Sequence, residues 1–333
     1  MLTKEFIFAS WTGSFYRRLK GVCLFVIMGV CLFSAPVHAF DILLGTEAPG
    51  SFSYFTGRML CRMINTQGEN LHCQQVSAPD GVHNLTNLQG GSLDLSLIDS
   101  RVLFDALNKT GNFKFLDISY NNLRALAPLY EVPITLIVRN DAGINSLDDL
   151  KGKRINAGNP QSLQYLSVEA ILQAKKWSQK DFSLVGALPP IKSQDTKAFC
   201  YGTMQAMVYV GQHPDFSLRR LLKTCNGELM DMADSDIDSM IDEHPEFWKI
   251  ELASGIYPSH PGKVTTFGTR AMLVASSDLD QETVYKIIEI IDKNKKQLAS
   301  AHPALSLFSV DTARKSASGM KLHPGAVKYF AEH

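Results

Sequence analysis

Short apolar runs alternate along the chain with segments in which apolar residues recur every three or four positions. The short runs predict strands, and the three-to-four spacing predicts helices. The expected strands cover residues 40–46, 73–77, 93–98, 123–130, 133–139, 154–157, 182–185, 204–210 and 263–276. The clearest expected helices cover residues 58–65, 80–90, 166–172, 194–200, 230–241 and 280–298. This regular alternation predicts an α/β protein with parallel, doubly wound sheets.

The order of the elements predicts two α/β lobes. We expect the chain to cross between them near Tyr130–Ile134 and to return near Val264–Thr269. Lobe 1 would then contain residues 40–133 and 267–333, and lobe 2 residues 134–266. Ligands of open α/β sheets bind at the carboxyl ends of strands, so two facing lobes would form a cleft that closes on a small molecule.

Residues 145–174 form the strand–loop–helix unit with the clearest candidate chemistry. Here the strand at 154–157 leads into the loop Gly158-Asn159-Pro160-Gln161-Ser162. A helix N-terminus presents unpaired N–H groups and a positive dipole end, so this loop suits an anion. The alternative is a tight turn with no ligand. The loop at 50–57, after the first strand, presents the same two options.

The N-terminus has the features of an export signal. Four basic residues, the last of them Lys20, precede an uncharged apolar run at residues 22–35. This run is too short for a typical membrane span and is followed by Val-His-Ala, which ends at Ala39. We predict a signal peptide over residues 1–39, cleaved after about Ala39. An uncleaved N-terminal anchor is the alternative.

Net charge and cysteine content narrow the class of protein further. The chain has a formal net charge of zero and no basic cluster, which argues against nucleic acid as a partner. Beyond the signal peptide, four cysteines remain, and an even number in an exported chain indicates two disulfides. Four cysteines allow three connectivities, and we adopt the local pairing of Cys61 with Cys73 and Cys200 with Cys225.

The motifs of common enzymes and metal sites are missing from the sequence. There is no Gly-x-Ser-x-Gly, His-Glu-x-x-His or phosphate-binding loop. Asp234, Asp236 and Asp238 alternate as in a calcium loop, but Ser239 and Pro245 replace its glycine and glutamate. We therefore expect a solvated helix there, and no catalytic residue, metal or cofactor.

A set of short motifs, in order along nearly all of the mature chain, resembles the TAXI family. TAXI proteins are the periplasmic solute receptors of tripartite ATP-independent (TRAP) transporters. The matching motifs are Tyr54-x-x-Gly57-x-x-Leu60-Cys61-x-x-Ile64-Asn65, Cys73, Val82-x-Asn84, Leu129-Tyr130, Asp149-Leu150-Lys151-Gly152-Lys153-Arg154, Gly158-Asn159-Pro160, Cys200, His213-Pro214, Tyr257 and His323-Pro324-Gly325-Ala326.

The resemblance implies a type II periplasmic-binding-protein fold with the ligand between the lobes. It also implies a monomer in the periplasm that delivers a small carboxylate or amino acid to a TRAP-type permease driven by an ion gradient. A sensor subunit that docks to a signalling membrane protein is one alternative, and a secreted enzyme is a weaker one.

Four motifs depart from the family pattern in the hydrogen-bonding groups, charge and volume that they present. This chain has Pro79-Asp80-Gly81 where the family has Gly-Gly-Ser, and Asp99-Ser100-Arg101 where the family has Gln-Ser-Asp. Gln161 and Leu163 replace two glycines of the family, and Gln205-Ala206 replaces Asp-Ala. The resemblance therefore implies that this chain has the fold and the cleft of the family, but it does not identify the ligand.

Eleven residues are our candidates for ligand contact. They are Tyr54, Gly81, Asn84, Asp99, Arg101, Asn159, Gln161, Ser162, Leu163, Gln205 and Tyr257. Ser162 would hold a carboxylate with the neighbouring N–H groups, or it would only cap its own helix. Arg101 would bind a carboxylate, or it would pair with Asp99 or Asp105. Gln205 and Tyr257 would contact ligand or only close the wall of the cleft.

Overall fold

The computed structural model describes residues 40–160, 162–188, 194–315 and 320–333. Of these, residues 41–333 form one compact unit around a single ten-stranded sheet. The predicted signal peptide lies outside the described residues. No helix in the described ranges has the length and apolar character needed to cross a membrane.

The strands follow the order β2-β1-β3-β10-β4-β7-β5-β6, with β8 paired to β4 and β9 paired to β10. Their bounds are β1 Phe40–Thr46, β2 Leu71–Ser77, β3 Leu95–Asp99, β4 Leu123–Arg139, β5 Arg154–Asn156, β6 Leu184–Gly186, β7 Ala206–Val210, β8 Gly227–Met230, β9 Trp248–Leu252 and β10 Val264–Ser276. This mixed α/β fold confirms the predicted fold class.

Helices connect most of the strands. Their bounds are α2 Phe52–Gln67, α3 Gly81–Gln89, α4 Ser100–Asn108, α5 Leu163–Ala174, α6 Gln194–Cys200, α7 Phe216–Thr224, α8 Ser235–Glu243, α9 Gln281–Lys293, α10 Lys295–Ala301, α11 Val310–Lys315 and α12 Pro324–Glu332. Short 3-10 turns cover Gly111–Phe113, Leu147–Leu150, Gln179–Asp181 and Pro303–Ser306.

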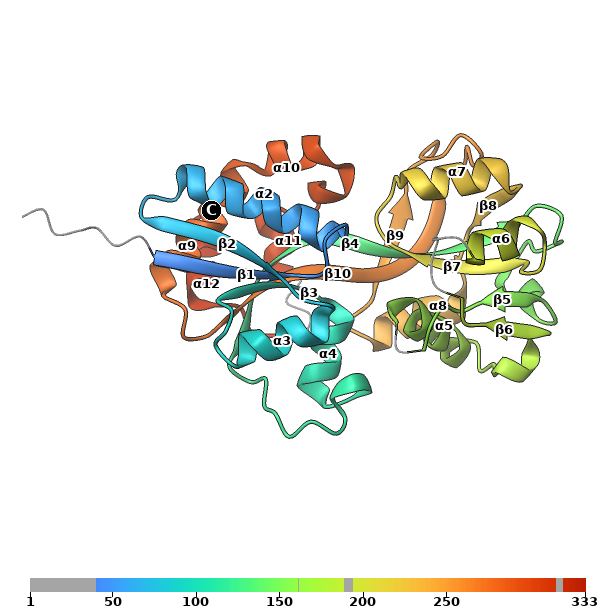
Figure 1. The fold of residues 1–333 in the computed structure, drawn as a ribbon, viewed down its shortest axis with the longest axis horizontal. Coiled ribbons are helices and arrows are strands. Elements are labelled where there is room, and N and C mark those ends of the chain that lie inside the picture. Colours follow the sequence, from blue (N-terminus) through green and yellow to red (C-terminus); the bar gives the residue numbers. More distant parts are fainter. Residues whose placement is uncertain (1–39, 161, 189–193, 316–319) are drawn as a thin grey trace, which may run out of the picture. The chain divides into compact units, whose positions relative to one another are not determined.

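The two longest strands, β4 and β10, join the two halves of the sheet (Figure 1). They pair antiparallel from Leu123 and Ser276 to Ile134 and Phe267. Beyond that point β4 pairs with β7 and β8, while β10 pairs with β9. We call the part with β1, β2 and β3 the first half of the sheet, and the part with β5 to β9 the second half.

This arrangement differs from the predicted one in two respects. The sheet is parallel at β1/β3 and at β6/β5/β7, but both joining strands run antiparallel to their neighbours. The runs at 123–130 and 133–139 form one continuous strand rather than two. The expected crossing points at 133/134 and 266/267 thus lie inside β4 and β10, with no separate linker.

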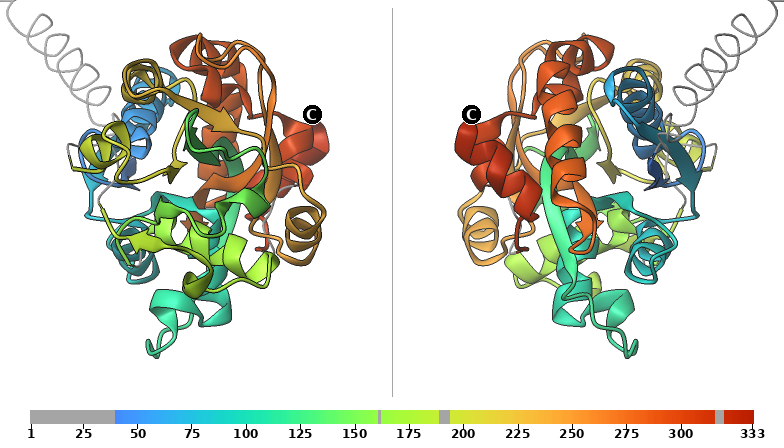
Figure 2. Two further views of the ribbon diagram at one scale, coloured as in Figure 1. Left: turned by 90° about the vertical axis from the view of Figure 1, so that its right-hand side faces the viewer. Right: turned by 90° about the vertical axis from the view of Figure 1, so that its left-hand side faces the viewer.

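Each half of the sheet buries an apolar cluster on both faces. In the first half, α2, α9 and α12 pack on one face, and α3 and α4 pack on the other (Figures 1 and 2). In the second half, α5 and α8 cover one face, and α6 and α7 cover the other. Successive residues of β4 alternate between these clusters, because side chains of a strand point to opposite faces.

Polar residues directly before the helices set where they begin. Ser51, Asp80, Asp99 and Ser162 each accept a hydrogen bond from a backbone N–H in the first turn of the helix that follows. Helix α2 begins at Phe52, earlier than the predicted start at residue 58, because Ser51 caps it there.

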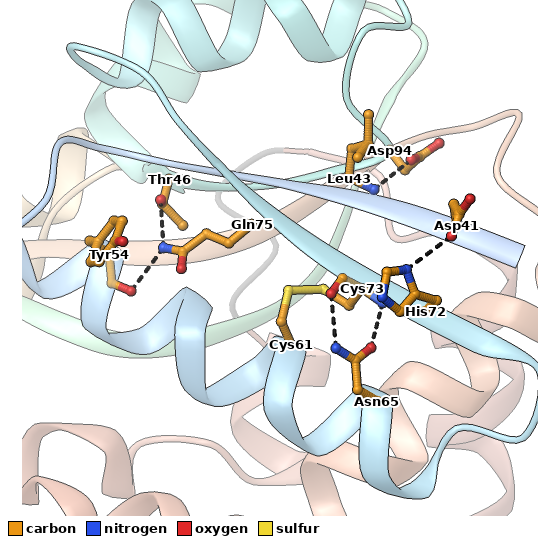
Figure 3. Close-up of a disulfide and its surroundings, with 10 residues drawn as sticks. All are labelled: Asp41, Leu43, Thr46, Tyr54, Cys61, Asn65, His72, Cys73, Gln75 and Asp94. Atoms are coloured by element: carbon orange, nitrogen blue, oxygen red, sulfur yellow. Dashed lines mark hydrogen bonds and ion pairs between the residues drawn. A yellow bond between two sulfur atoms is a disulfide. The ribbon is translucent and has the colours of Figure 1, made fainter.

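Both predicted cysteine pairs lie at disulfide distance. Cys61 and Cys73 connect α2 to β2 with their Cα atoms 4.8 Å apart. Cys200 and Cys225 connect the end of α6 to the end of α7 with a Cα separation of 4.4 Å. Asn65 stabilises the first bridge, because its side chain donates to the carbonyl of Cys73 and accepts from the N–H of Cys73 (Figure 3).

Candidate functional site

A cavity of about 310 Å³ lies between the two halves of the sheet. It is the main candidate site, because it collects the residues that follow β1, β3 and β7 together with the first turn of α5. Its lining residues are Glu47, Ser51, Phe52, Ser53, Leu97, Asp99, Tyr130, Val132, Ser162, Leu163, Gln164, Val210, Gly211, Gln212 and Ala271. Carboxyl ends of strands are where open α/β sheets bind ligands.

The first half contributes the acidic wall, which we define as Glu47, Asp99 and Tyr130. Glu47 directly follows β1, and Asp99 is the last residue of β3. Neighbouring parallel strands end at the same edge, so the pairing of β1 with β3 puts both carboxylates beside the cavity. Tyr130 lies on β4 and is 3% exposed. The charges of Glu47 and Asp99 both raise the pKa of its hydroxyl, after the larger effect of burial.

A polar clamp holds the loop that carries Glu47. The side-chain N–H₂ of Gln75 on β2 donates to Thr46 Oγ1 and to the carbonyl of Tyr54, both at 2.9 Å (Figure 3). These two acceptors flank residues 47–53, which form the loop after β1 and the first two residues of α2. A Cβ atom at Gly57 would collide with the side chain of Thr46, so α2 approaches the end of β1 closely. The acidic wall is therefore built on a well-supported turn.

Both carboxyl groups of the acidic wall have raised pKa values. Burial, followed by the charges of Asp99 and Asp80, raises the pKa of Glu47 to about 7. Burial also raises the pKa of Asp99 to about 6, although the Thr269 hydroxyl and the Arg101 N–H both donate to it. Near neutral pH the wall therefore holds one to two negative charges in a partly buried place.

The second half contributes the neutral wall, which we define as Ser162, Leu163, Gln164 and Gln212. Ser162 is the N-cap of α5, and its hydroxyl accepts from Tyr165 N at 3.1 Å and donates to the Asn159 carbonyl at 2.6 Å. This wall has no charged side chain, but the N-terminal end of α5 carries a partial positive charge. It can therefore favour a negative group without an ionised residue.

Gln164 ties the neutral wall to the sheet. It is 4% exposed, and its side-chain N–H₂ donates to the Val208 carbonyl of β7 at 2.6 Å. A Cβ atom at Gly158 would overlap the Gln164 amide, and Gly158 has a φ of +79°, so the loop needs glycine there for two reasons. The Oε1 atom of Gln164 has no hydrogen-bond partner among the described residues.

Three of the eleven predicted ligand residues line this cavity, namely Asp99, Ser162 and Leu163. Gln161 lies outside the described residues. Asn159 follows the loop glycine but is exposed, and its carbonyl is used by Ser162.

Arg101 lies near the acidic wall but not on the cavity lining. Its guanidinium contacts Asp105 Oδ2 at 3.3 Å and Glu246 Oε1 at 3.5 Å. Glu246 belongs to the second half and is fully buried. Ser100 also donates to the Glu246 carbonyl at 2.9 Å. Arg101 thus pairs with Asp105, one of its two expected partners, and is part of a contact between the halves, while its contact with a ligand stays a prediction.

Three further candidates belong to helices α2 and α3. Tyr54 is in the first turn of α2, where its carbonyl accepts from Gln75. Gly81 begins α3, and a Cβ there would touch Val102. Asn84 is fully buried in α3, and neither polar atom of its amide has a partner among the described residues. None of the three lines the cavity.

Gln205 and Tyr257 lie away from the cavity, in the second half. Gln205 Oε1 accepts from Arg154 N at 3.1 Å, which supports the edge of β5. Tyr257 is fully buried; its hydroxyl lies 2.7 Å from His213 Nδ1 and accepts from Asp215 N at 2.9 Å. Burial lowers the pKa of His213 to about 3, so the imidazole is neutral in this cluster.

The aspartates that resemble a calcium loop have a structural role in the described chain. Asp234 is the N-cap of α8, and Lys175 lies within 3.0 Å of carboxylate oxygens of both Asp234 and Asp236. In the described ranges, no three His, Cys, Asp or Glu side chains come together as metal ligands would.

Sequence reasoning missed Glu47, Tyr130 and Gln164 as candidates. The position of Glu47 could have identified it, because Glu47 is the first residue after the first predicted strand and ligands bind at strand ends. No sequence feature could have identified Gln164, because glutamine is common in the first turn of a helix and only the structure shows that it is buried.

Solved structures with low sequence identity share the fold. The periplasmic aliphatic sulphonate binding protein SsuA from Escherichia coli matches at a TM-score of 0.51 and 15% identity, over 88% of this chain and 79% of that one. The probable amino-acid ABC transporter extracellular-binding protein ytmK from Bacillus subtilis matches at a TM-score of 0.51 and 12% identity, over 80% and 98%. This chain thus has the fold of periplasmic binding proteins.

The sequence also matches a family model. The model is that of the NMT1-like family, and it aligns with residues 44–333, which include every strand except the first residues of β1. The match covers both walls of the cavity and the two joining strands. The chain belongs to the NMT1-like family.

Proposed function

We propose that this protein is an exported solute receptor that captures a small molecule in the cavity between the two halves of the sheet. The observation that carries the proposal is the cavity itself. It has the volume of a small ligand, it lies at the ends of strands, and both halves of the sheet line it. The fold of periplasmic binding proteins and the predicted signal peptide support export to the periplasm.

The two halves correspond to lobes in this proposal, with residues 40–133 and 267–333 in lobe 1 and residues 134–266 in lobe 2. Rotation about β4 and β10 would open and close the cavity. The first turn of α5 would hold a carboxylate of the ligand through backbone N–H groups, with Ser162 keeping that turn in place.

We further propose delivery to a TRAP-type permease, as a member of the TAXI group. The motif resemblance supports this choice. The ytmK protein from Bacillus subtilis, by contrast, is named as part of an ABC transporter. The two kinds of permease differ in energy source, so uptake in proteoliposomes distinguishes them. We expect uptake that needs an ion gradient and proceeds without ATP.

The central test is ligand identification from natively purified protein. Native mass spectrometry should show one small-molecule adduct per chain, and unfolding should release it. Adding the released compound back should raise the melting temperature, because a ligand that binds only the folded state stabilises it by mass action. Absence of an adduct, together with no shift across a broad metabolite screen, would refute the receptor proposal.

A further inference from the structure

One edge of β10 changes its partner strand where the two halves of the sheet meet. β3 pairs with residues 271–275 of β10, and β9 pairs with residues 264–268 on the same edge, opposite to β4. Thr269 and Arg270 lie between these two stretches and pair with β4 on the other edge. β4 and β10 are continuous through this point, whereas β3 and β9 leave a gap between them.

The hydroxyl of Ser100 fills this gap. Ser100 directly follows β3 and is fully buried. Its Oγ accepts from the backbone N–H of Arg270 at 3.0 Å and donates to the backbone carbonyl of Glu246 at 2.9 Å. Glu246 precedes β9 by two residues. One side chain therefore joins the first half, β10 and the second half, where an unbroken neighbouring strand would supply backbone partners.

We call Ser100, Arg101 and Glu246 the joint, and this joint adjoins the candidate cavity. The residue before Ser100 is Asp99, which lines the cavity and accepts from the Thr269 hydroxyl at 2.5 Å. The residue after Ser100 is Arg101, which contacts the Glu246 carboxylate at 3.5 Å. Three consecutive residues thus carry part of a cavity wall, a hydrogen bond across the gap and an ion pair across the gap.

Space on both faces of β4 gives the two halves room to rotate. Tyr130 and Val132 line the candidate cavity, whereas Glu131 and Pro133 line a second cavity of about 570 Å³. Successive residues of a strand point to opposite faces, so the two cavities lie on opposite faces of β4. Segments of both halves line the second cavity as well. Rotation about β4 and β10 would therefore widen one cavity and narrow the other.

We propose that Ser100 is a positioning residue for solute capture, because its hydroxyl holds the two halves in the arrangement that encloses the cavity. The inference rests on the proposed receptor function, since it requires a cavity that opens and closes. Opening separates Ser100 from the Glu246 carbonyl, whereas the bond from Arg270 and the pairing of β4 with β10 stay. Water replaces the lost partners, so the two arrangements differ by the net free energy of one hydrogen bond.

The joint forms only when the halves come together, so it should slow the release of a solute and leave its entry unchanged. The test compares the unmodified chain, Ser100→Ala and Ser96→Ala, each carrying its co-purified small-molecule adduct. Ser96 is the matched control, because it is also fully buried and does not line the cavity. Its Oγ donates to the Gly45 carbonyl at 3.1 Å, within the first half of the sheet.

Native mass spectrometry after dilution measures the rate at which the adduct leaves each protein. We expect release from Ser100→Ala to be about fivefold faster than from the unmodified chain, as the loss of one net hydrogen bond implies. Release from Ser96→Ala should match the unmodified chain. Rebinding of the released compound, followed by stopped-flow mixing, should have the same association rate in all three proteins. The melting temperatures without adduct check folding, and both variants should lose similar stability.

Hydrogen exchange of the unmodified chain provides a second measurement that needs no variant. Removal of the adduct should speed amide exchange at residues 99–101 and 246–247, because the joint opens. The paired residues of β4 and β10 should stay protected, because rotation about these strands keeps their pairing.

The outcomes separate this inference from the receptor proposal. Equal release rates for Ser100→Ala and the unmodified chain would overturn the role of the joint and leave the receptor proposal standing. Unchanged exchange at residues 246–247 on removal of the adduct would do the same. Equally fast release from Ser96→Ala and Ser100→Ala would also overturn it, because lost stability rather than opening would then explain the effect. An unmodified chain that carries no adduct and binds no compound of the metabolite screen would overturn both.

Discussion

The two walls of the cavity hold opposite electrostatic preferences by different means. The acidic wall uses the side chains of Glu47 and Asp99, whose pKa values of about 7 and about 6 reflect their burial. The neutral wall uses the backbone of the first turn of α5, capped by Ser162. A side-chain charge costs desolvation and responds to pH, whereas a helix end carries a fixed dipole. The difference implies that pH tunes one end of the site and not the other.

The walls also differ in how they are supported. Gln75 binds Thr46 and Tyr54 on either side of the loop that follows β1, and the Cys61–Cys73 bridge ties α2 to the same strand, β2 (Figure 3). The neutral wall follows β5, a strand of three residues, and depends on Gln164 for its contact with β7. We expect the acidic wall to be the more rigid of the two, and variants of each wall test this contrast.

The largest effect should come from Arg101, which joins the acidic side to the second half. Arg101→Met would leave the buried Glu246 carboxylate with only His244 beside it, 3.3 Å away, and should lower the free energy of unfolding by about 3 kcal/mol. Urea denaturation measures this loss in the free energy of unfolding, and Arg101→Lys is the control that keeps the charge. Unchanged stability combined with lost ligand affinity would instead make Arg101 a ligand-binding residue.

Next in size is a charge added to the neutral wall. Leu163→Asp at the first residue of α5 would put a carboxylate where the proposed ligand carboxylate binds, and should weaken ligand binding by about 2 kcal/mol. The helix itself should tolerate the change, because acids favour helix N-termini. Calorimetry against Leu163→Asn isolates the charge. If both variants bind alike, the carboxylate does not bind at this wall.

The acidic wall should make stability depend on pH. The folded-state pKa of Glu47 is about 7, above its ordinary value of 4.5, so the folded state holds the proton more tightly. The stabilisation of the folded state by protonated Glu47 is fully present below pH 4.5 and is lost as the pH rises through 7. The ligand-free protein should therefore lose about 1 kcal/mol or more relative to Glu47→Gln between pH 5 and pH 8. If the free energy of unfolding of both proteins changed equally with pH, the raised pKa assigned to Glu47 would be contradicted.

The smallest effect concerns the cap of the neutral wall. Ser162→Ala removes the acceptor for Tyr165 N and should cost about 1 kcal/mol of stability. Ligand affinity should fall only a few-fold, because the N–H groups of the turn remain. Ser162→Thr, which keeps the hydroxyl, serves as the control in thermal unfolding. An affinity loss of a hundredfold would assign the hydroxyl itself to the ligand.

Local signals in the sequence predicted much of the fold. β1 has the predicted bounds, and both local cysteine pairs lie at disulfide distance. These features depend on residues near one another in the chain. The length of β4 was not predicted, because Glu131 and Val132 continue the strand only through their pairing with β10.

The candidate site was predicted less completely than the fold. The α5 turn was found, since Ser162 and Leu163 belong to one local motif. Tyr257 matched a family motif, and Gln205 replaces the aspartate of another motif. Their polar groups bond to Arg154, His213 and Asp215 instead of lining the cavity. Hydrogen-bond partners from distant segments decide such roles, and no local pattern reveals them.

The sequence by itself thus determined the α/β alternation, the cysteine pairs and the strand–loop–helix unit that leads into α5. These follow from periodicity and from contacts over short stretches of chain. Only the tertiary structure decided that Glu47 and Asp99 share one wall and that α5 stands opposite them. The reason is that charge and burial at a cavity depend on which strand ends become neighbours, and pairing between β1, β3 and the two joining strands sets that arrangement.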